Sequence, residues 1–419
     1  MNVRPLVCVL SLLTVAVAFC QGEQVQAKSR REYVKVPVLF ITDRQAQKAG
    51  YGPYRVTEKE TVSRIDSGTA EVTIPIEAEP PAEWQHLDWM ERVRAPEKPA
   101  LTKFPGDTAE DLNGGFDTGL NQLMNRYQKK EVFLFVHGFN NSFPAALTKA
   151  AELSYATGCP VILYSWPSAG KVSRYLTDEG NNEWSQEHYN QLMEHLLHLQ
   201  ASAGISFNLV AHSLGNRLFA RSGPLIGGKG LFSDLYLVYP DIDAQTFVHY
   251  LARCIPPSGP AAGVRCRLLI SRKDKALAFS ERMFGGYTRL GQGVDFSLTA
   301  FTRPHLFRNV WELRQPAQST QEKTAIAPDK LEKIEKAFRI LDVTAADRGL
   351  IGHKIPYDVI AWMHYRNTAQ PGFEFQETQC KGLNRLASFF ARRSKQKVDP
   401  LLGKIFLLVK SSSLAKVAR

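Results

Sequence analysis

The chain has 419 residues, of which 44% are hydrophobic and 22% charged, so its composition is that of an ordinary globular protein. The length allows one large domain with appendages. The formal net charge of +11 does not predict nucleic-acid binding, because the excess is concentrated at one end. Between Cys380 and Arg419 there are ten Lys/Arg and one acid, a net of +9, and the main domain is close to neutral.

The first twenty residues have the features of a secretory leader. One early cation, Arg4, is followed by an uncharged apolar run that ends at Phe19, and polar residues come next. This run is too short to span a bilayer, and no later stretch approaches the roughly 20 apolar residues that a transmembrane helix needs. We expect residues 1–20 to be a signal peptide and the protein to be exported, to the periplasm, the cell envelope or the exterior. The alternative, a lipoprotein acylated at Cys20, is disfavoured by the bulky Phe19 before it.

Residues 28–128 are expected to hold early strands and a connecting segment. Tyr33–Ile41 has strand character, and Ala70–Ile76 alternates between apolar and polar residues. A Pro/Glu-rich stretch, Pro75–Pro99, follows, and Phe116–Tyr127 has a helical pattern.

From residue 129 onward, apolar runs alternate with helical patterns, and this order is typical of a mostly parallel sheet. The predicted strands are Val132–Val136, Pro160–Tyr164, Ser206–Val210, Leu235–Tyr239, Arg267–Ile270 and Phe338–Val343. Covering helices are predicted at Ala145–Thr157 and Ser185–Ala203, the second with Leu192, Leu196 and Leu199 on one stripe. We therefore predict an α/β fold over residues 129–379, with a central sheet flanked by helices.

Two appendages interrupt or follow this core. Residues 293–327 carry no clear strand and are expected to be an insertion, either a lid over the site or surface decoration. Residues 380–419 form a basic tail, which is either a solvated appendage or a segment that lies on an anionic membrane or envelope surface.

Four cysteines besides Cys20 remain once the leader is removed. An oxidising compartment permits disulfides, and Cys254 and Cys266 flank a Pro/Gly-rich loop, which makes them the best candidates for a pair. Two free thiols fit equally well, because the sequence does not determine connectivity.

The strongest chemical signal lies at Phe207–Gly215. An apolar strand runs directly into Ala-His-Ser-Leu-Gly and then into a helix-forming segment, the pattern of a nucleophile elbow. Its sharp corner needs small residues two positions on either side of the serine, and Ala211 and Gly215 meet that need, although Ala is a mild departure from the usual Gly. We predict Ser213 as the nucleophile, with the helix N-terminus supplying backbone donors. The alternative is a buried structural serine.

A second donor for an oxyanion is expected after the strand Val132–Phe139, which ends in His-Gly-Phe. The backbone amides of Phe139 and Leu214 are predicted to form the oxyanion hole. We expect His137 to order this loop and not to act as the base, because it precedes the nucleophile. In the chain order of this triad, the catalytic histidine comes last, after the acid. The same argument applies to His212.

The acid and the base are predicted from strand order. Asp274 follows the second strand after the elbow, the usual place of the acid, and Asp241 is the alternative. His353, in a Gly-containing loop just beyond the last predicted strand, is the predicted base. His305, which lies in the insertion, and His364, which lies in a helical pattern, are the other candidates.

No cofactor or metal is expected, because the chain has no HExxH motif, no closely spaced Cys/His cluster and no Gly-rich phosphate loop. Three residues near the predicted strand ends, His137, Asn140 and Trp166, are candidates for lining the mouth of a substrate pocket. For Trp166 the alternative is packing in the core.

An ordered set of motifs resembles the DUF900 family of bacterial α/β hydrolases, over a segment from about Val34 to Asp358. The motifs are Ile41–Arg44, Val136–Ser142, Tyr164–Ser168, Ala211–Asn216, Tyr239–Asp243 and Ser271–Leu277. The resemblance implies an α/β-hydrolase fold and a hydrolytic reaction, and it supports Ser213, Asp274 and His353 as the catalytic residues. It implies little about the substrate, because this fold hosts many reactions.

We expect an exported serine hydrolase that acts on a carboxylic ester of a small molecule or a lipid through an acyl-enzyme. An acyltransferase or an amidase would use the same triad. The non-enzymatic alternative is an inactive hydrolase-fold scaffold that binds the membrane or the envelope through its basic tail. No nucleic-acid partner is expected.

Overall fold

The computed structural model describes residues 33–48, 50–56, 65–76, 92–93, 98–104, 112, 114–226, 229–243, 246–247, 250, 264–271, 273–287, 289–292, 338–344, 350–364, 373–377 and 406–410. The predicted leader, the predicted insertion at 293–327, Cys254, His305 and all of the basic tail except 406–410 lie outside these residues.

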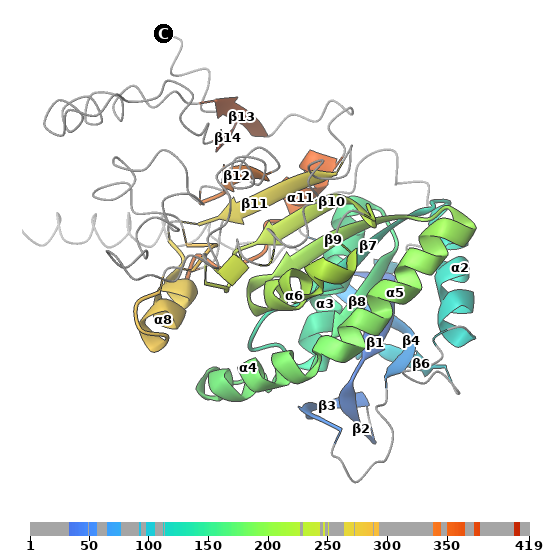
Figure 1. The fold of residues 1–419 in the computed structure, drawn as a ribbon. Coiled ribbons are helices and arrows are strands. Elements are labelled where there is room, and N and C mark those ends of the chain that lie inside the picture. Colours follow the sequence, from blue (N-terminus) through green and yellow to red (C-terminus); the bar gives the residue numbers. More distant parts are fainter. Residues whose placement is uncertain are drawn as a thin grey trace, which may run out of the picture.

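One large sheet runs through the described part of the chain (Figure 1). Its strands lie in the spatial order β13 (Phe373–Glu377), β14 (Phe406–Lys410), β12 (Phe338–Asp342), β11 (Arg265–Ile270), β10 (Phe232–Val238), β9 (Ser206–His212), β7 (Glu131–Val136), β8 (Val161–Ser165), β1 (Tyr33–Thr42), β4 (Asp66–Pro75) and β6 (Ala100–Lys103). β5 (Arg92–Val93) pairs with β1, and β2 (Arg44–Gln47) and β3 (Gly50–Arg55) form a separate hairpin sheet.

The centre of the sheet is parallel. Every neighbouring pair from β1 through β8, β7, β9, β10, β11 and β12 to β14 is parallel, whereas β4, β5, β6 and β13 pair antiparallel. This arrangement confirms the predicted mostly parallel α/β sheet. Because β1 pairs in parallel with β8, the predicted N-terminal strands extend the same sheet.

Helices cover both faces of the sheet. The helices α2 (Gly115–Tyr127), α5 (Gln186–Ala203) and α6 (Asn216–Ile226) share one hydrophobic cluster, and α3 (Phe143–Thr157), α8 (Lys275–Met283) and α11 (Tyr357–His364) share the other. Along β7, Leu134 belongs to the first cluster, and Phe133 and Phe135 belong to the second. Buried side chains therefore alternate between two cores, as the period of a strand requires.

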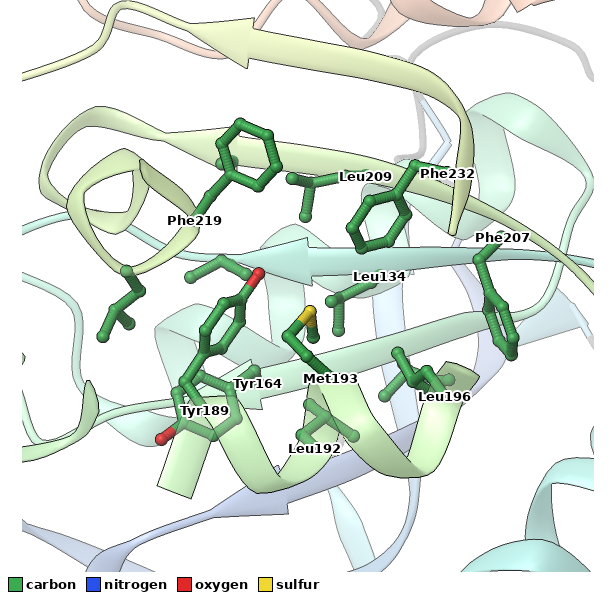
Figure 2. Close-up of a cluster of buried hydrophobic side chains, with 14 of the residues drawn as sticks. Leu134, Tyr164, Tyr189, Leu192, Met193, Leu196, Phe207, Leu209, Phe219 and Phe232 are labelled. Carbon is green, nitrogen blue, oxygen red and sulfur yellow. The ribbon is translucent and has the colours of Figure 1, made fainter. Parts of the chain in front are cut away.

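The predicted stripe on α5 packs as expected. Figure 2 shows Leu192, Met193 and Leu196 of this helix facing Leu134 and Leu209 of the sheet, and these side chains are fully buried. At roughly 25 cal/mol per Å² of apolar surface, each such burial contributes about 2 kcal/mol, so this helix depends on packing more than on propensity.

Local signals set the limits of the helices beside the strands. α3 begins after Ser142, whose Oγ accepts from the amide of Ala145 at 3.4 Å, and a proline occupies its first turn. It ends at Gly158 and α5 ends at Gly204, both with positive φ.

Some features differ from the sequence-based expectations or add to them. The helices α4 (Tyr175–Trp184) and α8 were not predicted, because they have nine or ten residues and only a few buried side chains. Cys266 is a free, buried thiol, so it does not form the predicted bridge to Cys254. Within the described residues, no helix combines the length and the apolarity needed to cross a membrane.

An ion pair between His364 and the partly exposed Glu131 joins α11 to the sheet. Nε2 of His364 lies 3.3 Å from Glu131 Oε2 and 3.8 Å from Cys159 Sγ. Burial works to lower the pKa of His364, but the hydrogen bonds with Cys159 and Glu131 outweigh it and raise the pKa to about 9. The hydrogen bond from His364, opposed by partial burial, lowers the pKa of Glu131 to about 2. His364 is therefore an imidazolium at neutral pH.

The pair predicts how stability depends on pH. The pKa of folded His364 lies above its ordinary value of 6.5, and that of folded Glu131 lies below its ordinary value of 4.5. The pair therefore stabilises the fold most between pH 4.5 and 6.5, and it loses this contribution as the pH rises toward 9 or falls toward 2. We expect His364→Gln to lower the urea midpoint of unfolding most between pH 4.5 and 6.5, and the difference from wild type to shrink toward pH 9. The exposed His198 supplies the control His198→Gln, for which no such trend is expected. An equal loss for His364→Gln at every pH would contradict the assignment.

Candidate active site

Ser213 stands at a sharp corner between β9 and the helical segment that follows it. The strand ends at His212, Ser213 has a φ of +52°, and the short helix η3 (Ser213–Gly215) continues into α6. A non-glycine residue in this left-handed region is strained by about 1–3 kcal/mol. Among the described residues, four non-glycine residues have positive φ, and Asn140, Ser213 and Tyr239 lie at the carboxyl ends of three adjacent strands.

Hydrogen bonds from a neighbouring side chain and strand hold this corner. Asn216 Nδ2 donates to the carbonyl oxygens of Ala211 and Ser213, at 3.0 Å each. The amide of Asp241 donates to the Ser213 carbonyl at 3.1 Å. Ser213 is therefore fixed from α6 and from the end of β10.

The loop after β7 lies directly against Ser213. An added Cβ at Gly138 would lie 2.6 Å from Ser213 Cβ, so only glycine permits this approach. The Gly138 carbonyl accepts at 2.8 Å from Asn141 Nδ2 and at 2.8 Å from His137 Nδ1. Because a trans peptide holds its C=O and N–H antiparallel, the Phe139 amide of the same peptide points away from these donors. Among the described residues, no hydrogen-bond acceptor occupies the amide of Phe139 or that of Leu214.

A buried guanidinium supports this loop from below. Arg44, at the start of β2, donates through Nη2 to the Asn141 carbonyl at 2.8 Å and through Nε to Ser165 Oγ at 2.9 Å. Burial lowers the pKa of Arg44 to about 9. Arg44 Nη2 also lies 3.2 Å from His137 Nε2. Burial and the Arg44 charge lower the pKa of His137 well below its usual range, so His137 is neutral and accepts from Arg44 while its Nδ1–H donates to Gly138.

The structure brings Asp274 and His353 together. Asp274 follows β11 and caps α8, where its Oδ1 accepts from the Leu277 amide at 2.9 Å. Its Oδ2 accepts from His353 Nδ1 at 2.6 Å. Burial raises the pKa of this carboxyl, and the hydrogen bond from His353 opposes the rise. Gly352 has a φ of +73°, and a side chain there would collide with the Lys273 carbonyl, which explains the glycine before His353.

The alternative acid, Asp241, has other partners. Its carboxylate accepts hydrogen bonds from Tyr175 and, at 2.7 Å, from Ser280, and Arg289 Nε lies 3.5 Å away. Within the described residues, no hydrogen bond joins Asp241 to His353.

His212 lies between His353 and the corner at Ser213. His212 Nε2 lies 3.2 Å from the His353 carbonyl, and the two rings are 4.8 Å apart. Burial lowers the pKa of His212 well below its usual range, so the ring is neutral and its Nε2–H donates to that carbonyl. The described contacts include no hydrogen bond between Ser213 and His353.

Residues 113–303 match a family described as α/β hydrolases of unknown function, DUF900. The match confirms, over that stretch, the resemblance seen in the sequence, and with the observed sheet it shows the α/β-hydrolase fold. No curated protein and no solved structure matches the chain. Ser213 and Asp274 lie inside the DUF900 segment, and His353 lies beyond it, after β12.

The three candidates for lining a pocket occupy different environments. Asn140 is exposed at the loop after β7. His137 and Trp166 are fully buried and stacked, with ring centroids 4.9 Å apart, and Trp166 Nε1 donates to the His137 carbonyl at 2.8 Å. Neither side chain reaches the surface, so both support the loop from beneath, as the packing alternative for Trp166 requires.

Sequence reasoning missed two supports of the site. Arg44 stood in one of the motifs that resemble DUF900, but its local sequence carries no sign of its role. Asp178 on α4 accepts from Ser168 Oγ at 2.5 Å and from the Ala169 amide at 2.8 Å. No helix was predicted over α4, so the sequence carried no local signal for a buried acid there.

A separate group of side chains has the composition of a metal site. The ligand atoms of Glu131, Cys159 and His364 lie within 4.8 Å of one another, at the opposite end of the strands from Ser213. Lys129 Nζ lies 3.6 Å from Cys159 Sγ, and His364 pairs with Glu131, so the three side chains already contact one another and a lysine.

The contact between the loop and the serine is open to a direct test. A methyl group at position 138 would displace the loop from Ser213, so we expect Gly138→Ala to slow modification of Ser213 by a fluorophosphonate about a hundredfold, the usual cost of losing one oxyanion donor. Gly180→Ala in α4 is the matched control, because an added Cβ there meets nothing within 4 Å. A folded Gly138→Ala protein that reacts as fast as wild type would refute this role of the loop.

Proposed function

We propose that this α/β hydrolase is a serine hydrolase that cleaves carboxylic esters through an acyl-enzyme. The observation that carries the proposal is the left-handed Ser213 at a strand-to-helix corner, with two unoccupied amides beside it and a hydrogen-bonded pair, Asp274 and His353, in the segments that follow β11 and β12. Export through a leader, the oxidising compartment and the basic tail as an anchor stay predictions from the sequence.

Each residue has one role in the proposed reaction. Imidazole Nε2 of His353 takes the proton of Ser213 as the hydroxyl oxygen attacks the ester carbonyl. Asp274 holds the Nδ1–H tautomer and stabilises the imidazolium that forms. The amides of Phe139 and Leu214 donate to the oxyanion, and His353 then protonates the leaving alkoxide. Water, activated by the same imidazole, releases the acid and restores Ser213.

The electrostatics around the corner favour this chemistry. The two donors for the oxyanion are backbone amides, which need no reorganisation when charge develops. Because burial disfavours the charged form of both His137 and His212, no permanent positive charge of these rings lies beside the nucleophile. His353, by contrast, has the Asp274 carboxylate on its Nδ1 side to stabilise its protonated form.

A fluorophosphonate probe tests the nucleophile. We expect the folded wild-type chain to be modified on Ser213, as located by peptide mass spectrometry, and Ser213→Ala to stay unmodified. Ester turnover should be lost in the same variant. Modification at another serine, or none in folded protein, would contradict the proposal.

The two aspartates supply a matched pair of variants for the same assay. Asp274→Asn should slow Ser213 modification by about 10⁴-fold, because the amide favours the wrong imidazole tautomer. Asp241→Asn leaves the His353 contact intact and should slow it far less. An equal loss in both variants would remove Asp274 from the proposed triad.

A further inference from the structure

Exposed hydrophobic side chains are concentrated around the candidate active site. Eight large hydrophobic side chains are exposed among the described residues, and seven of them lie on three segments, 171–176, 273–287 and 350–354. We call these segments the rim. The seven are Val172, Leu176, Phe279, Met283, Tyr287, Leu350 and Ile351. The eighth, Tyr54, lies on β3 in the separate hairpin sheet.

Every exposed charged side chain of the rim is a cation. These cations are Lys171, Arg174, Lys273, Lys275, Arg282 and Lys354. The two acids of the rim are engaged elsewhere: Asp274 is buried against His353, and Glu281 accepts from Gln292 Nε2 at 2.7 Å. The exposed charges of the rim are therefore all positive, six cations against the partly buried Glu281.

Helix α8 shows how the two kinds of side chain are interleaved. Lys275, Phe279 and Met283 follow one another at four-residue spacing and share one helix face, where Phe279 is 49% exposed and Met283 41%. Leu277 and Ser280 face the protein and are buried. A helix that serves only as a cover would present polar residues on its outer face, so the apolar residues there need another explanation.

The three segments of the rim meet beside the proposed triad. Tyr175, between Val172 and Leu176, places its hydroxyl 3.0 Å from Ser280 Oγ, and its ring lies 5.7 Å from that of Phe284. The Lys275 amide donates to the Ile351 carbonyl at 2.8 Å, two residues before His353. Figure 1 shows α4 and α8 on the same side of the molecule, and these two hydrogen bonds join the three segments of the rim.

We propose that the rim docks on an anionic lipid surface and that the site takes its substrate, a long-chain acyl ester, from that surface. The substrate class rests on the proposed serine-hydrolase function, whereas the docking does not. Apolar side chains interleaved with cations match the two components of such a surface, its acyl region and its phosphate groups. Docking through the rim brings the lipid against the segments that carry Asp274 and His353.

Sedimentation with lipid vesicles tests the docking apart from catalysis. The full chain carrying Ser213→Ala is mixed with vesicles of phosphatidylcholine alone or with added phosphatidylglycerol. We expect it to sediment with the anionic vesicles and far less with the neutral ones, with binding that weakens as salt is raised. A chain that binds neither kind of vesicle would overturn the proposal.

Variants of the rim separate it from the basic tail. Arg174→Gln, Lys275→Gln and Arg282→Gln combined should weaken binding about a hundredfold, at about fivefold for each charge. The control carries the same change at three exposed lysines outside the rim, Lys48, Lys98 and Lys229, and should bind as the parent does. If the rim variant also binds as the parent does, the tail or another region is responsible and the proposal is wrong.

The apolar part of the rim has its own variant and control. Leu176→Ser, Phe279→Ser and Met283→Ser combined, in a chain that keeps Ser213, should slow hydrolysis of a vesicle-borne long-chain ester at least tenfold and leave a soluble short-chain ester unaffected. Tyr54→Ser, at the exposed hydrophobic residue outside the rim, should change neither rate. Equal loss on both esters would overturn the role of the rim. If Ser213 is inert, the chain without rim substitutions hydrolyses neither ester but still binds anionic vesicles. Failure of the proposed function is thereby distinguished from failure of the docking.

Discussion

The left-handed conformation of Ser213 is the constraint on which the arrangement of the site depends. With a φ of +52°, the residue turns the chain from β9 into α6 within one corner, which leaves room for the loop after β7 to touch it at Gly138. The strain of about 1–3 kcal/mol persists because Asn216 and the Asp241 amide hold the Ser213 carbonyl from two sides. In the proposed reaction, the strained backbone of Ser213 already has the conformation in which its hydroxyl attacks the substrate.

Polar groups buried beneath the corner keep the second loop in place. Arg44 bonds to His137 and to the Asn141 carbonyl, and His137 in turn bonds to the Gly138 carbonyl, so a chain of donors runs from β2 to the loop. Such a network stabilises a single conformation because any unpaired member would carry a large desolvation cost. The buried Asp274 follows the same rule, since its partners are His353 and the Leu277 amide. The geometry of the site thus depends on satisfied buried polar groups as much as on the hydrophobic cores.

Features with a local sequence signal were predictable. The parallel sheet follows from the alternation of apolar runs and helical patterns. The strand-to-helix corner at Ser213 and the position of Asp274 after β11 follow from the same strand order, and the catalytic roles of both residues stay predictions. Arg44 was not predictable, because its partners Ser165 and Asn141 lie 121 and 97 residues away in the sequence and nothing in its neighbourhood indicates burial. Helices α4 and α8 were missed because they bury few side chains, and the apolar residues on their outer faces conceal the usual helical stripe.

In the proposed function, the corner at Ser213, two backbone amides and the His353 imidazole form one hydrolytic site on an α/β-hydrolase fold. A crystal structure of the chain with a phosphonate ester bound to it tests this most directly, because a phosphonyl group is tetrahedral like the intermediate. The account predicts a bond to Ser213 Oγ, a phosphonyl oxygen within about 2.7–3.1 Å of the amides of Phe139 and Leu214, and the His353 ring within hydrogen-bond reach of Oγ. An adduct on Ser213 whose oxygen points away from both amides, or a His353 ring turned away from Asp274, would contradict it.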